Sequence, residues 1–144
     1  MRFSELLEPQ KGSSVQDIQR LQQLARQRFP VVLHEHGLIL RDPKERIPAH
    51  GNFVVIGVAA GYSNADLQFL DEIAAVLKQV RGDRIEIFDA STLKNMEEFE
   101  AFIPSIASVY QTPIVGFWVD GVLSERTTGK PARDFLRARY LKDS

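Results

Sequence analysis

The chain has 144 residues, of which 44% are hydrophobic and 26% are charged, and this balance predicts one globular domain with a sizeable core. Its formal net charge of -1 disfavours nucleic-acid binding, because proteins that bind polyanions are normally strongly basic. The sequence contains no cysteine, which excludes disulfides, thiolate metal sites and thiol chemistry together.

Neither a secretory signal nor a membrane span is predicted. The first residues lack a basic patch followed by an apolar stretch, and the longest apolar run, residues 53–60, is too short to cross a bilayer. We therefore expect a cytoplasmic protein without membrane insertion. The sequence leaves open whether the chain forms a homo-oligomer.

A helix is predicted near the N-terminus. Ser14 and Asp17 have the spacing of a capping box, and apolar residues then recur at helical intervals. These signals place the helix at about residues 15–28. Pro30 is expected to end it, because proline removes a hydrogen bond from a helix interior.

Residues 30–42, "PVVLHEHGLILRD", contain two apolar runs and predict a short hairpin or one bent strand. Alternate residues of a strand lie on one face, so His34 and His36 would point the same way, and His50 follows in a predicted loop. Three imidazoles are suitable ligands for zinc. An exposed hairpin without metal is the favoured interpretation, because no clear fourth ligand accompanies them.

The apolar run "FVVIGV", residues 53–58, is typical of a strand covered on both faces and should be central in a sheet. Ser63 is placed to cap the helix that follows, with Asp66 at its third position. The apolar stripe of this helix recurs at helical spacing and consists of Leu67, Leu70, Ile73, Ala74 and Leu77.

Alternating apolar residues in "RIEIFDA", residues 84–90, predict another strand, in which Glu86 separates Ile85 from Ile87. Residues 92–110 are then expected to be helical. Pro104 should kink or divide that helix.

A hairpin is predicted near the C-terminus. The apolar run "PIVGFWV", residues 113–119, leads through Asp120-Gly121 into "VLSER", residues 122–126, and Asp-Gly favours a tight turn between antiparallel strands.

Gly129 and Pro131 should precede a final helix, with Phe135, Leu136 and Tyr140 facing the sheet. Basic residues near helical spacing form a possible stripe here: Arg126, Lys130, Arg133 and Arg137. Such a stripe can receive an acidic partner or a nucleic-acid backbone, although it is more often a solvated helix face.

This order of elements, with a parallel crossover first and an antiparallel hairpin last, resembles the thioredoxin-like superfamily over residues 53–141. "FLDEIAAVL" looks like the helix that follows the active-site cysteines of thioredoxins, "QTPIVGFWVDGVL" like their proline, strand, turn and next strand, and "TTGKPARDFL" like the last helix. That proline is cis in thioredoxins, and the sequence leaves open whether Pro113 is cis. The resemblance implies an α/β fold, a mixed sheet flanked by helices. Residues 1–30 would be an N-terminal arm and helix, and residues 31–144 the thioredoxin-like domain.

The resemblance places Ala60-Gly61-Tyr62-Ser63 where thioredoxins carry Cys-x-x-Cys. The chemistry of that motif depends on a thiolate, so thiol-disulfide exchange is excluded. A serine nucleophile needs an adjacent base, and none is evident, so Ser63 is better interpreted as a helix cap. We therefore expect no catalytic residue and no cofactor.

Thioredoxin-like proteins use the backbone of their proline loop to pair with an extended peptide, and Pro113, preceded by Thr112, matches that proline. Tyr62 would lie beside it. The alternative is that Pro113 only begins a strand and Tyr62 is an ordinary surface residue. The predicted binding residues are Ala60, Gly61, Tyr62, Ser63, Thr112 and Pro113.

The resemblance thus implies a redox-inactive adaptor or assembly chaperone that binds a protein or an extended peptide segment. Cysteine-free members of the superfamily with such roles include accessory proteins of hydrogenase maturation and a cyanobacterial clock protein, and the sequence singles out neither. Two alternatives remain at this point: an enzyme that binds a small thiol such as glutathione through the proline loop, and a metal-binding protein that uses its histidines.

Overall fold

A mixed five-stranded sheet forms the centre of the protein, with the strand order β1-β3-β2-β4-β5. The computed structural model describes residues 1–8, 14–42, 45–80, 82–92 and 111–141. The strands are β1 (Ile39–Leu40), β2 (Asn52–Val58), β3 (Asp83–Asp89), β4 (Ile114–Val119) and β5 (Val122–Thr128). β1 and β2 run parallel to β3, whereas β4 is antiparallel to β2 and β5 to β4. The predicted central place of the strand at residues 53–58 is confirmed.

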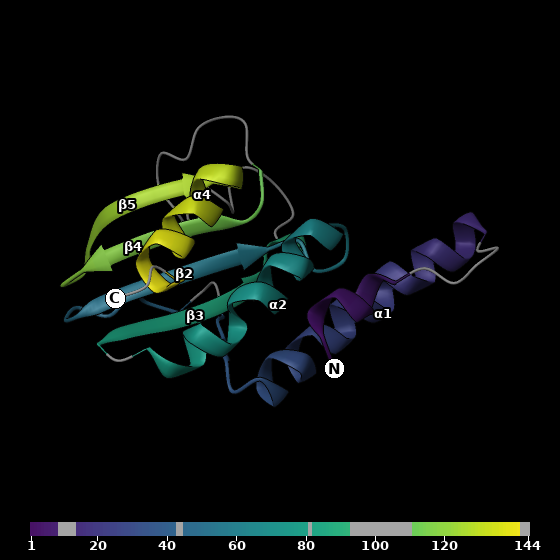
Figure 1. Ribbon diagram of the computed structural model, residues 1–144, viewed down its shortest axis with the longest axis horizontal. Helices are drawn as coiled ribbons and strands as arrows, with labels where there is room; N and C mark the ends of the chain where they lie inside the picture. Colours follow the sequence, from purple (N-terminus) through teal and green to yellow (C-terminus); the bar gives the residue numbers. More distant parts are fainter. Residues whose placement is uncertain (9–13, 43–44, 81, 93–110, 142–144) are drawn as a thin grey trace.

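Helices cover one face of this sheet (Figure 1). They are α1 (Val15–Glu35), α2 (Asn64–Gln79) and α4 (Gly129–Leu136), which continues into the π-helical turn η3 (Arg137–Leu141); η1 (Phe3–Leu7) and η2 (Ala90–Thr92) are short 3₁₀ helices. All five residues of the stripe predicted for α2 are buried. The strand order and these helices give the chain a thioredoxin-like α/β fold. No helix among the described residues is both long and apolar enough to cross a membrane.

The predicted end of the first helix is wrong. α1 passes through Pro30 and continues to Glu35, and the hairpin or bent strand expected at residues 30–42 does not form. Proline inside a helix costs about 3 kcal/mol. Val32 and Leu33, beyond Pro30, are almost fully buried in the core, and each such burial contributes about 1.5–3 kcal/mol, enough to offset that cost.

The predicted C-terminal hairpin is confirmed. Asp120 and Gly121 have φ angles of 50° and 80°, and positive φ at both central residues belongs to the turn that matches the twist of paired strands. α4 begins at Gly129 rather than after Pro131, which lies in the first helical turn, where a missing N–H is harmless. Most of the helix predicted at residues 92–110 lies outside the described residues.

The second face of the sheet carries a smaller cluster that includes Phe53, Phe88 and Trp118. Gly57 lies on the same face, and a Cβ built on it would lie 2.5 Å from the ring of Phe88. Because Gly57 has no side chain, the Phe88 ring can approach β2 this closely.

A buried ion pair lies beside this second cluster. Glu86, which we expected only to alternate with apolar neighbours along β3, is 2% exposed and accepts hydrogen bonds of 3.0 Å from Arg41 and 2.9 Å from Arg84. Buried charges persist only where they are paired, so Arg41 and Glu86 depend on each other.

The C-terminal turn η3 is tied to the sheet by Asp83, the first residue of β3. Its carboxylate accepts two hydrogen bonds from the Arg139 guanidinium, one from the Tyr140 hydroxyl and one from the Asn52 amide. Burial raises the pKa of Asp83, but the hydrogen bonds outweigh burial and hold it below its ordinary value. Burial and the neighbouring carboxylate raise the pKa of Tyr140, which stays a neutral donor.

Candidate functional site

The loop between β2 and α2 is where the resemblance places the thioredoxin cysteines. Ser63 is the N-cap of α2, as predicted, because its hydroxyl oxygen accepts the Asp66 amide at 3.2 Å. The Asp66 carboxylate accepts the Ala59 amide at 3.0 Å. Both side chains therefore shape the loop.

Two of the predicted binding residues in this loop, Ala60 and Gly61, are buried. The Ala60 amide donates to the buried carboxylate of Asp89 at 3.2 Å. α1 lies against Gly61, since a Cβ built there would be 2.6 Å from Cγ of Arg26. Tyr62, by contrast, is 61% exposed, so it is the side chain that this loop offers to a partner.

The proline loop leads into β4. The Thr112–Pro113 peptide bond is cis, which the sequence had left open. The carbonyl of the buried Pro113 accepts the Gly129 amide at 2.8 Å, which links the loop to the start of α4. Among the described residues, no backbone hydrogen bond involves the amide or carbonyl of the half-buried Thr112.

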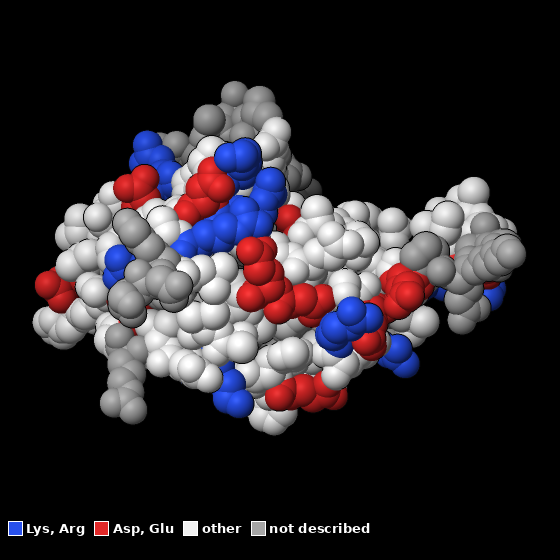
Figure 2. All heavy atoms as spheres, viewed as in Figure 1, with Lys and Arg blue, Asp and Glu red and all other residues white. Residues whose placement is uncertain are grey.

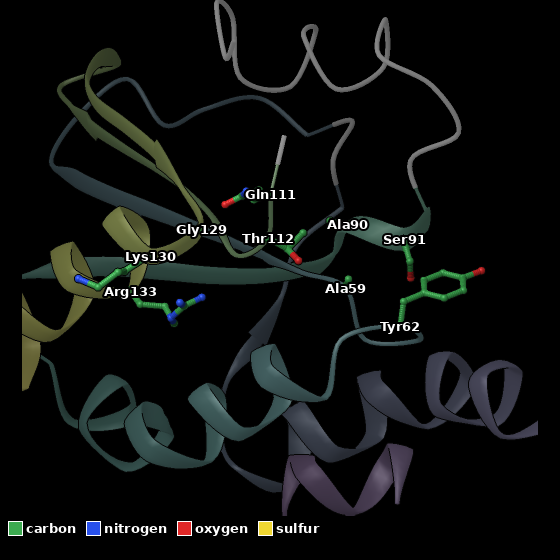
Figure 3. A pocket seen from close by; sticks show the side chains of 9 residues that line it. All are labelled: Ala59, Tyr62, Ala90, Ser91, Gln111, Thr112, Gly129, Lys130 and Arg133. Carbon is green, nitrogen blue, oxygen red and sulfur yellow. The ribbon is translucent and has the colours of Figure 1, made fainter. Parts of the chain in front are cut away.

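A cavity of about 660 Å³ lies between these two loops and α4 (Figure 3). Tyr62 and Thr112 both line it, so the structure brings together two of the six predicted binding residues. Ala60, Gly61, Ser63 and Pro113 are not part of its wall. Side chains that the sequence analysis did not assign to the site also line it: Ser91, Gln111, Lys130 and Arg133.

Lys130 and Arg133 belong to the basic stripe considered from the sequence; the structure separates Arg126 from that stripe and pairs two of its other members with carboxylates. Arg126 lies on the exposed strand β5, Lys130 pairs with Asp134 at 2.8 Å, and Arg137 pairs with Glu72 on α2 at 2.9 Å. The hydrogen bond from Arg137 lowers the pKa of Glu72, and the one from Lys130 lowers the pKa of Asp134.

The space-filling view shows basic side chains gathered over α4 next to acidic side chains over α2 (Figure 2). The i, i+4 spacing of Lys130 and Asp134 is the sequence signal for their pairing. Nothing local in the sequence distinguishes Arg133 from its neighbours.

The three histidines are placed differently from the strand arrangement that motivated the metal hypothesis. His34 is in the last turn of α1, and His36 follows the helix, where its ring stacks on Phe3 with centroids 4.6 Å apart and its Nε2 lies 2.8 Å from the Met1 carbonyl. His50 is exposed ahead of β2. Across the described part of the chain, no three His, Asp or Glu side chains form a group that could hold a metal ion.

The comparisons with known proteins found a similarity in structure and none in sequence. No protein-family model matches the chain, and a search of curated proteins finds no match. Among solved structures, the chain is similar to a mutant thioredoxin from Halobacterium salinarum NRC-1, with 15% identity and a TM-score of 0.42, over 66% of this chain and 79% of that one. A likeness at this level says nothing about function.

Proposed function

We propose that this protein is a redox-inactive adaptor or assembly chaperone that binds an extended segment of a partner protein at the Tyr62/Pro113 face. This face comprises Tyr62, Thr112, Pro113 and the cavity that adjoins them. One observation carries the proposal: the exposed ring of Tyr62 shares a cavity with the proline loop, while the cysteines that would make the same place an active site are absent.

The proline loop supports binding through the main chain. An extended peptide that adds to a sheet edge or an exposed backbone segment gains hydrogen bonds in a regular series. The Thr112 peptide groups have no backbone partner within the described residues, which supports pairing with such a peptide. Pro113 cannot donate, which confines pairing at this point to Thr112.

Tyr62 supports binding through its side chain. A tyrosine that is 61% exposed at the rim of a cavity offers a large apolar surface and a polar hydroxyl with few rotatable bonds. Tyrosine is enriched at the energetic centres of protein interfaces for this reason.

The same cavity gives some support to the second candidate, binding of a small thiol such as glutathione. Its volume of about 660 Å³ is in the range of ligand pockets, and Ser91, Gln111 and Thr112 supply polar groups. We favour the peptide because an exposed aromatic ring, together with peptide groups that have no backbone partner among the described residues, is a feature of peptide recognition. Competition by glutathione for the bound peptide would favour the small thiol.

The test uses a display library of random peptides selected on the immobilised protein. Synthetic copies of enriched peptides are then measured by fluorescence anisotropy against wild type, Tyr62→Ala and Val122→Ala. Val122 is a matched control, since it is a 68% exposed apolar residue on β5 that does not line the cavity. We expect Tyr62→Ala to weaken binding about tenfold or more and Val122→Ala to leave it unchanged.

Main-chain pairing has its own test. Methylation of the one peptide nitrogen that donates to Thr112 should abolish binding, whereas methylation of its neighbours should be tolerated, because adjacent N–H groups of a paired strand face opposite sides. Peptides that bind Tyr62→Ala as tightly as wild type, or that tolerate methylation at every position, would contradict the proposed face.

A further inference from the structure

We infer that the partner segment carries an acidic side chain and that Arg133 receives its carboxylate inside the cavity. This inference rests on the proposed function and specifies the chemistry of the partner. It is drawn from the charged side chains around the cavity and from how each of them is engaged.

The Arg133 side chain is half-buried and lines the cavity, and no hydrogen bond or ion pair joins it to a described residue, although its charge helps to lower the pKa of Asp134. Figure 3 shows its side chain leaving α4 toward Ala59, across the space between the helix and the end of β2. A guanidinium carries five N–H donors in a rigid fork that matches the two oxygens of a carboxylate. Arg133 therefore presents a ready receptor for an acid that enters the cavity.

The other charged groups near the cavity are already engaged. Lys130 is held by Asp134 at 2.8 Å, and in Figure 3 its amino group points away from Arg133. Asp89 accepts hydrogen bonds from the amides of Ala60 and Ser91 and does not line the cavity. Among the described residues that line the cavity, the charged ones are Lys130 and Arg133, and none is a carboxylate.

The scale of this site fits a single carboxylate on a peptide. A nucleic-acid backbone needs a row of phosphate contacts, whereas two of the basic residues that would supply them are paired with carboxylates, Lys130 with Asp134 and Arg137 with Glu72. A paired peptide presents alternate side chains to one face, so a segment bound to Thr112 can direct one acid toward Arg133 while its neighbours point elsewhere.

The random-peptide selection also tests this inference. We expect peptides enriched on wild type to carry Asp or Glu at one position, and those enriched on Arg133→Glu to carry Lys or Arg there. Arg126→Glu is the matched control, because it makes the same charge change on exposed β5, outside the cavity. It should keep the acidic preference.

Affinities of the synthetic peptides give a second readout. Arg133→Ala should weaken an acidic peptide by about 10- to 100-fold, and replacing the peptide's Glu by Gln should cost the same on wild type but little on Arg133→Ala. Arg133→Lys should retain the acidic preference. Urea unfolding of each variant, followed by tryptophan fluorescence, verifies that it folds.

The outcomes separate the two proposals. Peptides that depend on Tyr62 but show no acidic preference, or a preference that Arg133→Glu leaves unchanged, would overturn the role of Arg133 and leave the proposed function standing. An equal effect of Arg126→Glu would also overturn it, because general surface charge would then suffice. If no selected peptide depends on Tyr62, the proposed function itself fails.

Discussion

Replacing Asp83 by asparagine should loosen the C-terminal turn from the sheet. Oδ2 of Asp83 accepts hydrogen bonds of 2.7 Å from both Nε of Arg139 and the Tyr140 hydroxyl, and Oδ1 accepts 3.0 Å from Arg139 and 3.2 Å from Asn52. An asparagine of the same shape keeps one acceptor oxygen. Its amide nitrogen replaces the other oxygen and is itself a donor. It would therefore face N–H or O–H donors that now find an acceptor on Asp83.

The loss follows from these contacts. A hydrogen bond to a charged group contributes about 1.5–3 kcal/mol. The substitution removes the negative charge of Asp83 and one of the two oxygens that accept from Arg139. The Arg139 side chain is 32% exposed and can regain water, so the cost stays below the roughly 3–5 kcal/mol of an orphaned buried charge. We expect Asp83→Asn to lower the free energy of unfolding by about 2–3 kcal/mol.

The effect should depend on pH. The pKa of Asp83 is lower in the folded protein than in the unfolded chain, where it is about 3.9. The contribution of Asp83 to stability is therefore fully present above the unfolded-state pKa and is lost as the pH falls through the folded-state pKa. The stability difference between wild type and Asp83→Asn should therefore narrow on acidification below about pH 4.

Urea unfolding measures both effects, with Trp118, the single tryptophan of the chain, as a buried probe on β4. A loss of about 2–3 kcal/mol corresponds to a midpoint lower by about 1–2 M. Asp134→Asn is the control, because its pair with Lys130 is exposed to solvent and should contribute little to stability. The reasoning would be refuted if the unfolding free energy of Asp83→Asn lay within about 0.5 kcal/mol of wild type at neutral pH, or if the difference between the two proteins persisted in acid.

Three further substitutions test other parts of the structure by the same unfolding assay. Gly57→Ala should lower stability by about 1–3 kcal/mol or more, because its Cβ would lie 2.5 Å from the Phe88 ring, and an unchanged midpoint would show that the ring moves freely. Ser63→Ala should cost about 0.5–2 kcal/mol by removing the cap of α2, and no loss would argue against the capping role. Glu86→Gln should cost about 3–5 kcal/mol because Arg41 would keep a buried charge, and a loss below about 1 kcal/mol would mean that water reaches that pair.

Elements with strong local signals were predictable. α2 combines a capping serine with an apolar stripe at helical spacing, and the hairpin combines alternating strands with an Asp-Gly turn. Each signal acts within a few residues and does not depend on the rest of the chain.

Elements that depend on distant contacts were not predictable from local signals. α1 continues past Pro30 because residues beyond the proline are buried in the core, and Glu86 is buried because Arg41 reaches it from another segment. Burial in the core can outweigh the local conformational preference of a residue.

The candidate site divides in the same way. Resemblance to the thioredoxin pattern led to Tyr62 and Thr112, which share the cavity, because the ends of β2 and β4 meet wherever this sheet forms. It also led to Ala60 and Gly61, which are buried, with α1 packed against Gly61. Arg133 was one of four similar basic residues until the fold paired two of them and left it at the cavity wall.

The sequence by itself determined that this protein has no thiol chemistry, because the chain contains no cysteine. It also determined where α2 begins, because Ser63 caps that helix through neighbouring residues alone. Only the tertiary structure decided which side chains face the cavity and which are covered. The physical reason is that capping and turn formation involve neighbouring residues, whereas burial and ion pairing join residues far apart along the chain, such as Arg41 and Glu86.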